Sequence, residues 1–112
     1  MNRKFRLTSS LDIQRVRRQG KSYAHPLLVL VALENQLDQT RFAVSAGVSV
    51  GNAVQRNRAK RLIRAGLQDY LEKVKKGYDI LLIARKPLAD AASPDAAAAL
   101  EAMLRKADLL ST

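Results

Sequence analysis

Residues 51–64 are basic and free of carboxylates, and they begin an apolar pattern that continues to residue 74. Five of these fourteen residues are Lys or Arg. Apolar side chains recur at the i, i+3, i+4, i+7 spacing of an amphipathic helix, and they are Ala59, Leu62, Ile63, Leu67, Tyr70, Leu71 and Val74. We expect Asn52 to cap the start of this helix and Gly77 to end it. The helix has to bury one side, so the rest of the chain must supply an apolar surface for it.

The two sides of the predicted helix differ in chemistry. At ~100° per residue, the side away from the apolar stripe carries Asn57, Arg58, Arg61 and Arg64, while Arg56 and Lys60 lie at the edge of the stripe. Guanidinium groups stay charged and fork onto phosphate oxygens, so a row of them along a rigid helix suits an RNA or DNA backbone. Gly66 lies on the buried stripe, where glycine costs about 1 kcal/mol relative to alanine. A close approach between the helix and an underlying strand would explain that glycine.

The alternative interpretation of the basic side is an ordinary solvated surface. Such surfaces alternate positive and negative charges along a helix. Here six consecutive charged residues from Arg41 to Arg64 are positive, and no carboxylate occurs between Asp38 and Asp69. Cations gathered in this way repel one another unless a polyanion neutralises them. The pattern therefore favours a nucleic-acid surface over a solvated face.

The whole chain has the size and charge of one nucleic-acid-binding domain. We expect residues 1–112 to form a single RNA-binding domain, with residues 1–6 as a basic N-terminal arm. The net charge is +10, which favours nucleic acid first and an anionic membrane second. No apolar run approaches the ~20 residues of a membrane span, and the N-terminus does not resemble a signal peptide. With no cysteine, a disulfide framework or thiolate metal site is excluded, and we expect a cytoplasmic protein.

The remaining elements are predicted from shorter patterns. A helix is expected over residues 11–19, with caps available in residues 7–10, a stop at Gly20, and Ile13 and Val16 on its buried face. Apolar strands are expected over 26–33, 41–48 and 78–84, the first two forming an antiparallel hairpin. A last helix should begin with Ser93 as N-cap and Pro94 at its first position. We predict an α/β (α+β) two-layer sandwich with a small mixed sheet, in the order α-β-β-(β)-α-β-α, where the strand in parentheses has no assigned residues.

No constellation in the sequence indicates a catalytic or metal site. The only histidine, His25, has no cysteine or acidic pair near it, so a turn or surface histidine is the favoured interpretation. The segment 47–52 faintly resembles a phosphate loop but lacks the Gly-Lys-Ser/Thr ending. We expect Gly51 and Asn52 to end a strand and start the helix, although free N–H groups there could also hold a phosphate or a hydrated cation. By itself this polypeptide does not look like a catalyst.

The central segment resembles bacterial ribonuclease P proteins, which carry an Arg-Asn-Arg signature on a basic helix. The matching residues are Gly51-Asn52-Ala53-Val54, Arg56-Asn57-Arg58 and Lys60-Arg61-Leu62-Ile63-Arg64. The resemblance extends through Arg6-Leu7, Gly20-Lys21, residues 41–45 and residues 78–87. It covers nearly the whole chain, in matching order and spacing.

The resemblance implies a subunit role in transfer RNA maturation. The holoenzyme removes the 5′ leader of precursor tRNA, and its RNA subunit performs the endonucleolytic cut with bound magnesium ions. The protein subunit is not catalytic, holds the leader in a cleft between its first helix and its sheet, and strengthens productive metal binding. The implied partners are ribonuclease P RNA and precursor tRNA, with no membrane and no small-molecule substrate. The chain is expected to be monomeric in the holoenzyme, to bind no metal tightly itself, and to contain a left-handed βαβ crossover, an exception to the usual hand.

The resemblance also assigns residues to two sites. The RNA-binding set is Asn52, Arg56, Asn57, Arg58, Lys60, Arg61 and Arg64. The leader-cleft set is Ile13, Val16, Arg17, Val31, Phe42, Arg85 and Lys86. The family often has aromatic residues at Ile13, Arg17 and Val31, where stacking contributes ~1–3 kcal/mol per base, and lysines at Val48 and Ser49. Without them, leader contact should rely more on charge, and core packing is an equal alternative for Ile13, Val16 and Val31.

Two other functions remain open from the sequence. One is a ribosomal or ribosome-assembly protein of similar build that binds structured RNA without a processing role. The other is a DNA-binding module with the basic helix in the major groove. Groove recognition uses polar side chains that reach base edges. This helix offers only Gln55 and Asn57 besides its cations, which suits phosphate contact better.

Overall fold

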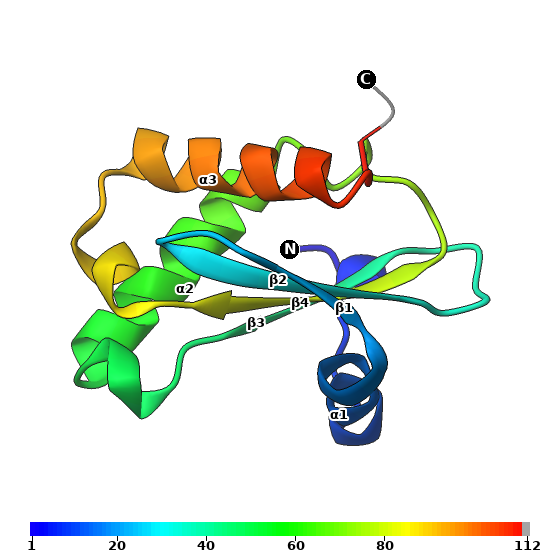
Figure 1. Cartoon of the computed structure of the whole chain (residues 1–112), viewed down its shortest axis with the longest axis horizontal. Helices are drawn as coiled ribbons and strands as arrows, with labels where there is room; N and C mark the ends of the chain where they lie inside the picture. The colour runs from blue at the N-terminus through cyan, green and yellow to red at the C-terminus, as the bar shows by residue number, and fades with distance from the viewer. Residues whose placement is uncertain (111–112) are drawn as a thin grey trace.

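The computed structural model describes residues 1–110 and contains a four-stranded sheet with three α-helices (Figure 1). The α-helices and strands are α1 (Ser10–Gln19), β1 (Lys21–Ala24), β2 (Leu28–Glu34), β3 (Arg41–Ser45), α2 (Ala53–Leu67), β4 (Tyr78–Ala84) and α3 (Ser93–Lys106). Three short 3-10 helices are η1 (Arg3–Phe5), η2 (Val48–Val50) and η3 (Lys86–Asp90). The predicted mixed α+β fold and the order of its elements are confirmed. No helix within residues 1–110 combines the length and the apolar composition that crossing a membrane requires.

The strands are ordered β1-β2-β4-β3, so the predicted hairpin between residues 26–33 and 41–48 is wrong. Strand β4 lies between them, antiparallel to β2 and parallel to β3. The loop from β2 to β3 holds the start of β4 in this position. The backbone N–H of Asn35 donates to Gly77 O at 2.9 Å, and the hydroxyl of Thr40 accepts from Tyr78 N–H at 3.2 Å. The hairpin is instead β1–β2, and β1 escaped assignment because it is short and mostly exposed.

Helix α2 begins as predicted but ends early. Asn52 is the N-cap, and its side chain and that of Gln55 each accept a hydrogen bond from the other's backbone N–H. The helix ends at Leu67, not at Gly77. Beyond it, Tyr70 N–H donates to Leu67 O at 2.8 Å, which is a tighter i→i+3 turn. Residues 71 and 74 still reach the core, so the apolar spacing continues past the end of the α-helix.

The sheet is covered on both faces. Helices α2 and α3 pack on one face over the main core, which includes Phe42, Ile63 and Leu100. Helix α1 packs on the other face through Val16 over a smaller cluster that includes Leu81 (Figure 1). These two faces alternate along each strand, as the pleat requires.

Three other local predictions are corrected. A Cβ on Gly66 would lie 2.5 Å from Leu100 Cδ1, so the close approach at this glycine is to α3 and not to a strand. Ala92, not Ser93, is the N-cap of α3, and no side chain caps this end; Pro94 is therefore the second helical residue and not the first. Strand β3 stops at Ser45, short of residue 48, because η2 turns the chain at Val48, whose side chain is 83% exposed.

Candidate RNA-binding interface

The cations of α2 stand on a helix that the core holds rigidly. Its apolar side chains Ala59, Leu62, Ile63 and Leu67 are buried. Of the RNA-binding set, Asn52, Asn57, Arg58, Arg61 and Arg64 are exposed, and Arg56 and Lys60 are half-buried, as the helical wheel predicted.

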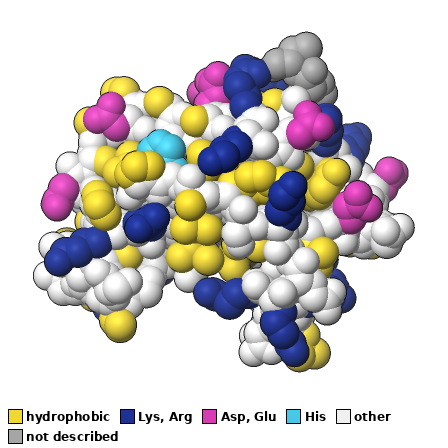
Figure 2. All heavy atoms as spheres, viewed as in Figure 1, with side chains coloured by type: hydrophobic (Ala, Val, Ile, Leu, Met, Phe, Trp, Pro, Cys, Tyr) yellow, Lys and Arg dark blue, Asp and Glu magenta, His cyan; other side chains and the backbone are white. Residues whose placement is uncertain are grey.

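None of these cations forms an ion pair with a carboxylate of residues 1–110. The ion pairs in this part of the chain use other cations, which are Lys4, Arg15, Arg41, Lys75 and Arg105. In the view of Figure 2, Lys and Arg side chains surround exposed hydrophobic side chains, and Asp and Glu lie mostly toward the margin. The basic side of α2 is therefore available to an external anion.

The charge on α2 opposes the stability of the helix itself. Acidic side chains stabilise a helix N-terminus because they complement its dipole. The first turn of α2 has no acidic residue, and Arg56 follows directly, with its Nη1 donating to Gly51 O at 3.0 Å. The helix dipole disfavours a cation at this end, and the hydrogen bond to Gly51 O offsets part of that cost, so helix stability alone does not explain the charge.

Arg58 differs from its neighbours because its guanidinium bonds to the protein backbone. Its Nε donates to Ala89 O at 2.7 Å and its Nη2 to Ala91 O at 3.0 Å. The helical wheel placed Arg58 on the exposed side correctly but gave no sign of these acceptors. They belong to η3 and to the connector that leads to α3.

An open groove of about 500 Å³ lies between the N-terminal arm, α1, β3 and the end of α2. It is lined by Met1, Arg6, Leu7, Thr8, Ile13, Phe42, Ala43, Val44 and Arg64, with no carboxylate among them. Strand β3 is an edge of the sheet. Leu7 N–H donates to Phe42 O at 2.8 Å, so the arm covers this edge near residue 42. The sequence patterns did not predict Thr8 or Val44 as part of this groove, and they assigned Arg6 only to a basic arm.

Three members of the predicted leader cleft are inside the protein. Val16 is fully buried, and Val31 and Phe42 are 3% and 1% exposed. Val16 and Val31 belong to the cluster under α1, which supports the packing alternative for them. Phe42 points to the opposite face of the sheet, into the core under α2 and α3. These side chains offer almost no surface to an RNA strand, so the predicted set is corrected at these positions.

The other members of that set do not meet in one cleft. Ile13 is half-buried at the groove, and Arg17 is exposed on α1 beside Gln14 and Arg18. Arg85 and Lys86 follow the end of β4, whereas α1 contacts β4 near its beginning. The sheet face beside α1 instead carries three half-buried aliphatic residues that were not predicted, Val29, Leu33 and Ile83. They were not predicted, because the sequence does not reveal which part of this sheet face α1 leaves uncovered.

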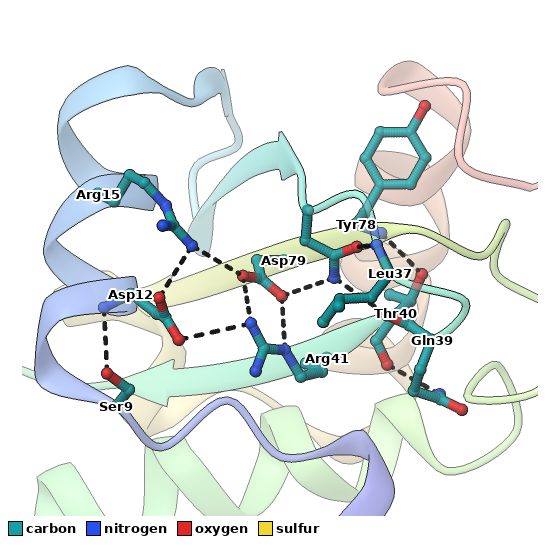
Figure 3. A network of polar contacts seen from close by, with 10 residues as sticks. Ser9, Asp12, Arg15, Leu37, Gln39, Thr40, Arg41, Tyr78 and Asp79 are labelled. Carbon is teal, nitrogen blue, oxygen red and sulfur yellow. Dashed lines mark hydrogen bonds and ion pairs between the residues drawn. The ribbon is translucent and has the colours of Figure 1, made fainter.

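An ion-pair network joins α1 to the sheet (Figure 3). Arg41 of β3 binds the fully buried Asp79 of β4, and its Nη2 also lies 3.5 Å from Asp12 of α1. The hydrogen bond to Asp79 raises the pKa of Arg41, although burial opposes the shift. Arg41 is the first of the six consecutive positive charges in the sequence, and it is paired with the protein's own carboxylates.

Comparison with known proteins connects this geometry to one family. The family model described as Ribonuclease P matches residues 1–108. The chain belongs to the ribonuclease P family. It is 36% identical over 109 residues to the ribonuclease P protein component of Clostridioides difficile (strain 630), covering 96% of both chains.

Solved structures of the family have the same fold. The RNase P protein of Staphylococcus aureus superposes with a TM-score of 0.85 at 30% identity, covering 96% of this chain and 98% of that one. The RNase P protein of Thermotoga maritima gives a TM-score of 0.80 at 26% identity, covering 90% and 96%. The resemblance drawn from the Arg-Asn-Arg segment is thus confirmed.

His25, the acidic side chains and segment 47–52 were considered from the sequence for catalysis, metal binding or phosphate binding, and their positions in the fold are as follows. Nδ1 of His25 accepts from Leu27 N–H at 3.0 Å, which makes it a turn histidine, as favoured from the sequence. Within residues 1–110, no group of three or more His, Cys, Asp or Glu side chains is arranged to hold a metal ion. Segment 47–52 forms η2 and the cap of α2.

Proposed function

We propose that this chain is the protein subunit of ribonuclease P and that it assists an RNA subunit in removing the 5′ leader of precursor tRNA. One observation carries the proposal: the cations of α2 have no carboxylate partner within residues 1–110, while the opposite side of the same helix is locked in the core. A row of cations without carboxylate partners on a packed helix matches the negative charge of an RNA backbone. Membership of the ribonuclease P family supports the same function.

The RNA-binding residues of α2 contribute positive charge and polar contacts to the RNA subunit. Arg56, Lys60, Arg61 and Arg64 supply positive charge to phosphates of the RNA subunit, and Asn52 and Asn57 add polar contacts to phosphate or sugar. These six residues position the RNA subunit and neutralise part of its charge. In this proposal the RNA subunit cleaves the bond, and His25, whose Nδ1 accepts from Leu27 N–H, serves in a turn. Mg²⁺ enters with the RNA subunit and acts there.

Leader contact follows the groove beside β3. The groove joins α1 to the end of α2, and it carries Arg6 and Arg64 on its walls with no acidic residue. The phenylalanine that lines it, Phe42, is only 1% exposed, so the groove presents no aromatic ring for a base to stack on. An extended leader would be held here mainly through its phosphates, and its binding should depend strongly on salt. Exposed Arg17, Arg85 and Lys86 lie outside the groove and would act on more distant nucleotides.

The partners in this proposal are ribonuclease P RNA and precursor tRNA, with one copy of the chain in each holoenzyme. No small-molecule substrate and no membrane is involved, and tRNA maturation would place the protein in the cytoplasm. The ribosomal alternative has gained no support, since no observation in the fold or its relatives favours it over the processing role.

Reconstitution tests the proposal. The purified protein should not cut precursor tRNA alone, but it should stimulate cleavage by a bacterial ribonuclease P RNA at limiting magnesium. A protein component from a related bacterium serves as the working control, and the RNA alone gives the baseline. If the control stimulates cleavage and this chain stimulates no such RNA, the ribosomal alternative becomes the better explanation.

A further inference from the structure

The second arginine of the Arg-Asn-Arg signature has two ties to distant backbone. The carbonyl oxygens that accept from Arg58, those of Ala89 and Ala91, are 31 and 33 residues further along the chain. Both distances, 2.7 Å and 3.0 Å, are those of well-formed hydrogen bonds. A charged donor makes such bonds stronger than neutral ones. Arg58 therefore fastens α2 to the connector between β4 and α3.

Within residues 1–110, that connector has one other side-chain hydrogen bond, from Arg85 Nη1 to His25 O at 3.4 Å, at its start. The last carbonyl groups of a short helix have no partner within the helix. Neither η3 nor the start of α3 has a side-chain cap. Within residues 1–110, Arg58 is the one side chain that donates hydrogen bonds to the carbonyls of residues 86–92. Leu88 and Ala89 hold the connector on the core because both are buried. The two hydrogen bonds of Arg58 hold the connector against α2.

The anchored connector carries a second group of cations. Lys86 is the first residue of η3 and Arg85 precedes it, and both are exposed. A 3-10 helix rises about 2.0 Å per residue, so Lys86 lies roughly 6 Å along the axis from Ala89. Neither cation forms an ion pair with a carboxylate in the described part of the chain. The hydrogen bonds of Arg58 are thus the side-chain link between α2 and the segment that carries Lys86.

We propose that Arg58 is a positioning residue that holds the β4–α3 connector on α2, so that Lys86 and the cations of α2 meet RNA as one surface. This inference rests on the proposed RNA-binding function and gives one signature residue a separate role in it. Arg58 uses two of its five N–H groups in these bonds, and its charge still adds to the surface. The two hydrogen bonds of the planar guanidinium, and not its charge, position the connector.

The distinction between fork and charge makes the inference testable with a conservative variant. Lysine keeps the positive charge but cannot reproduce the planar fork that spans two acceptors. If Arg58 served only to attract phosphate, Arg58→Lys would bind RNA nearly as well as the natural protein. Arg61→Lys is the matched control, because Arg61 is exposed on the same helix and has no hydrogen-bond partner within residues 1–110.

The first measurement uses the protein alone. The chain has no cysteine, so Val54→Cys with Lys86→Cys provides two unique positions for spin labels. Val54 is 75% exposed and is suited to labelling. Electron paramagnetic resonance should give a narrow distance distribution, which Arg58→Lys broadens or shifts and Arg61→Lys leaves unchanged. An unchanged distribution in Arg58→Lys would overturn the anchor, and circular dichroism verifies that each variant is folded.

The second measurement is a double-mutant cycle on binding to a bacterial ribonuclease P RNA. Lys86→Ala should weaken binding in the natural background but have little further effect when Arg58 is lysine, a non-additivity of about three- to tenfold. Combined with Arg61→Ala, Lys86→Ala should retain its full effect. Additive effects in both backgrounds would overturn the inference while leaving the proposed function intact. Failure of the natural protein to bind the RNA would overturn the proposed function, whereas the label distances decide the anchor separately.

Discussion

Arg41 of β3 binds the buried carboxylate of Asp79 in β4 with two hydrogen bonds, 2.9 Å from Nε to Oδ1 and 2.8 Å from Nη2 to Oδ2 (Figure 3). The two residues are partners in the parallel ladder. Asp12 and Arg15 of α1 extend the network, and Arg15 lies 2.8 Å from Asp12 and 3.9 Å from Asp79. This network and a small apolar cluster together hold α1 on the sheet, beside the groove.

Arg41→Leu should destabilise the fold by about 3–5 kcal/mol, because it leaves the carboxylate of Asp79 buried without its main partner. The side-chain amide of Asn35, 2.9 Å away, would remain as a neutral donor. Adding Asp79→Asn should restore much of the stability, since no charge then stays buried. Urea unfolding of both variants measures the difference, and a double variant less stable than Arg41→Leu would contradict this explanation.

Tyr70, beyond the end of α2, donates a hydrogen bond to Glu101 of α3. This bond, aided by Arg105, lowers the pKa of Glu101, and the same bond raises the pKa of Tyr70. The stabilisation is therefore complete between the two ordinary pKa values. It should be lost as pH falls through the lowered pKa of Glu101, and again as pH rises through the raised pKa of Tyr70.

Thermal unfolding across pH tests this pair. The Tm advantage of the natural protein over Tyr70→Phe should be constant near neutral pH and shrink at both ends of the range. Arg15→Ala is a control that leaves Tyr70 and Glu101 in place and should keep the two-sided profile. Profiles of the natural protein and Tyr70→Phe that stay parallel over the whole range would show that the bond adds no stability.

Local signals predicted local structure well in this chain. The run 78–84 became β4 with the predicted bounds, and Asn52 capped α2, because each depends on residues within one turn or one strand. The end of α2 was missed because the apolar spacing at Leu71 and Val74 also suits successive tight turns. Periodicity records which side chains are buried, and different backbones can bury the same set.

The missed parts of the site are contacts between distant segments. Arg41 and Asp79 are 38 residues apart, and Arg58 and Ala89 are 31 apart. Strand order determines such contacts, and the apolar runs of β2, β3 and β4 are compatible with more than one order. The same uncertainty hid the burial of Phe42 in the core under α2 and α3, because a strand's two faces are distinguished only when its neighbours are known.

Removing two free cations from α2 should reduce the salt dependence of RNA binding. Arg61→Ala with Arg64→Ala should lower the slope of log affinity against log salt, by ~0.7–0.9 for each phosphate that the helix no longer neutralises. Arg105→Ala with Lys106→Ala, on α3, matches the change in net charge and should leave the slope nearly unchanged. Filter binding to a bacterial ribonuclease P RNA over a range of salt gives both slopes. Equal slopes for the two double variants would remove α2 from the interface.

A ring placed in the groove should strengthen leader binding. Ile13 is half-buried in the groove wall, so Ile13→Phe gives the leader a stacking partner worth ~1–3 kcal/mol per base. Holoenzyme with this variant should bind leader-bearing precursor tRNA more tightly, and precursor without a leader as before. Leu11→Phe is the matched control, because Leu11 is 78% exposed and does not line the groove. If Ile13→Phe changes both precursors equally, or if the natural holoenzyme binds both equally, the leader does not pass through this groove.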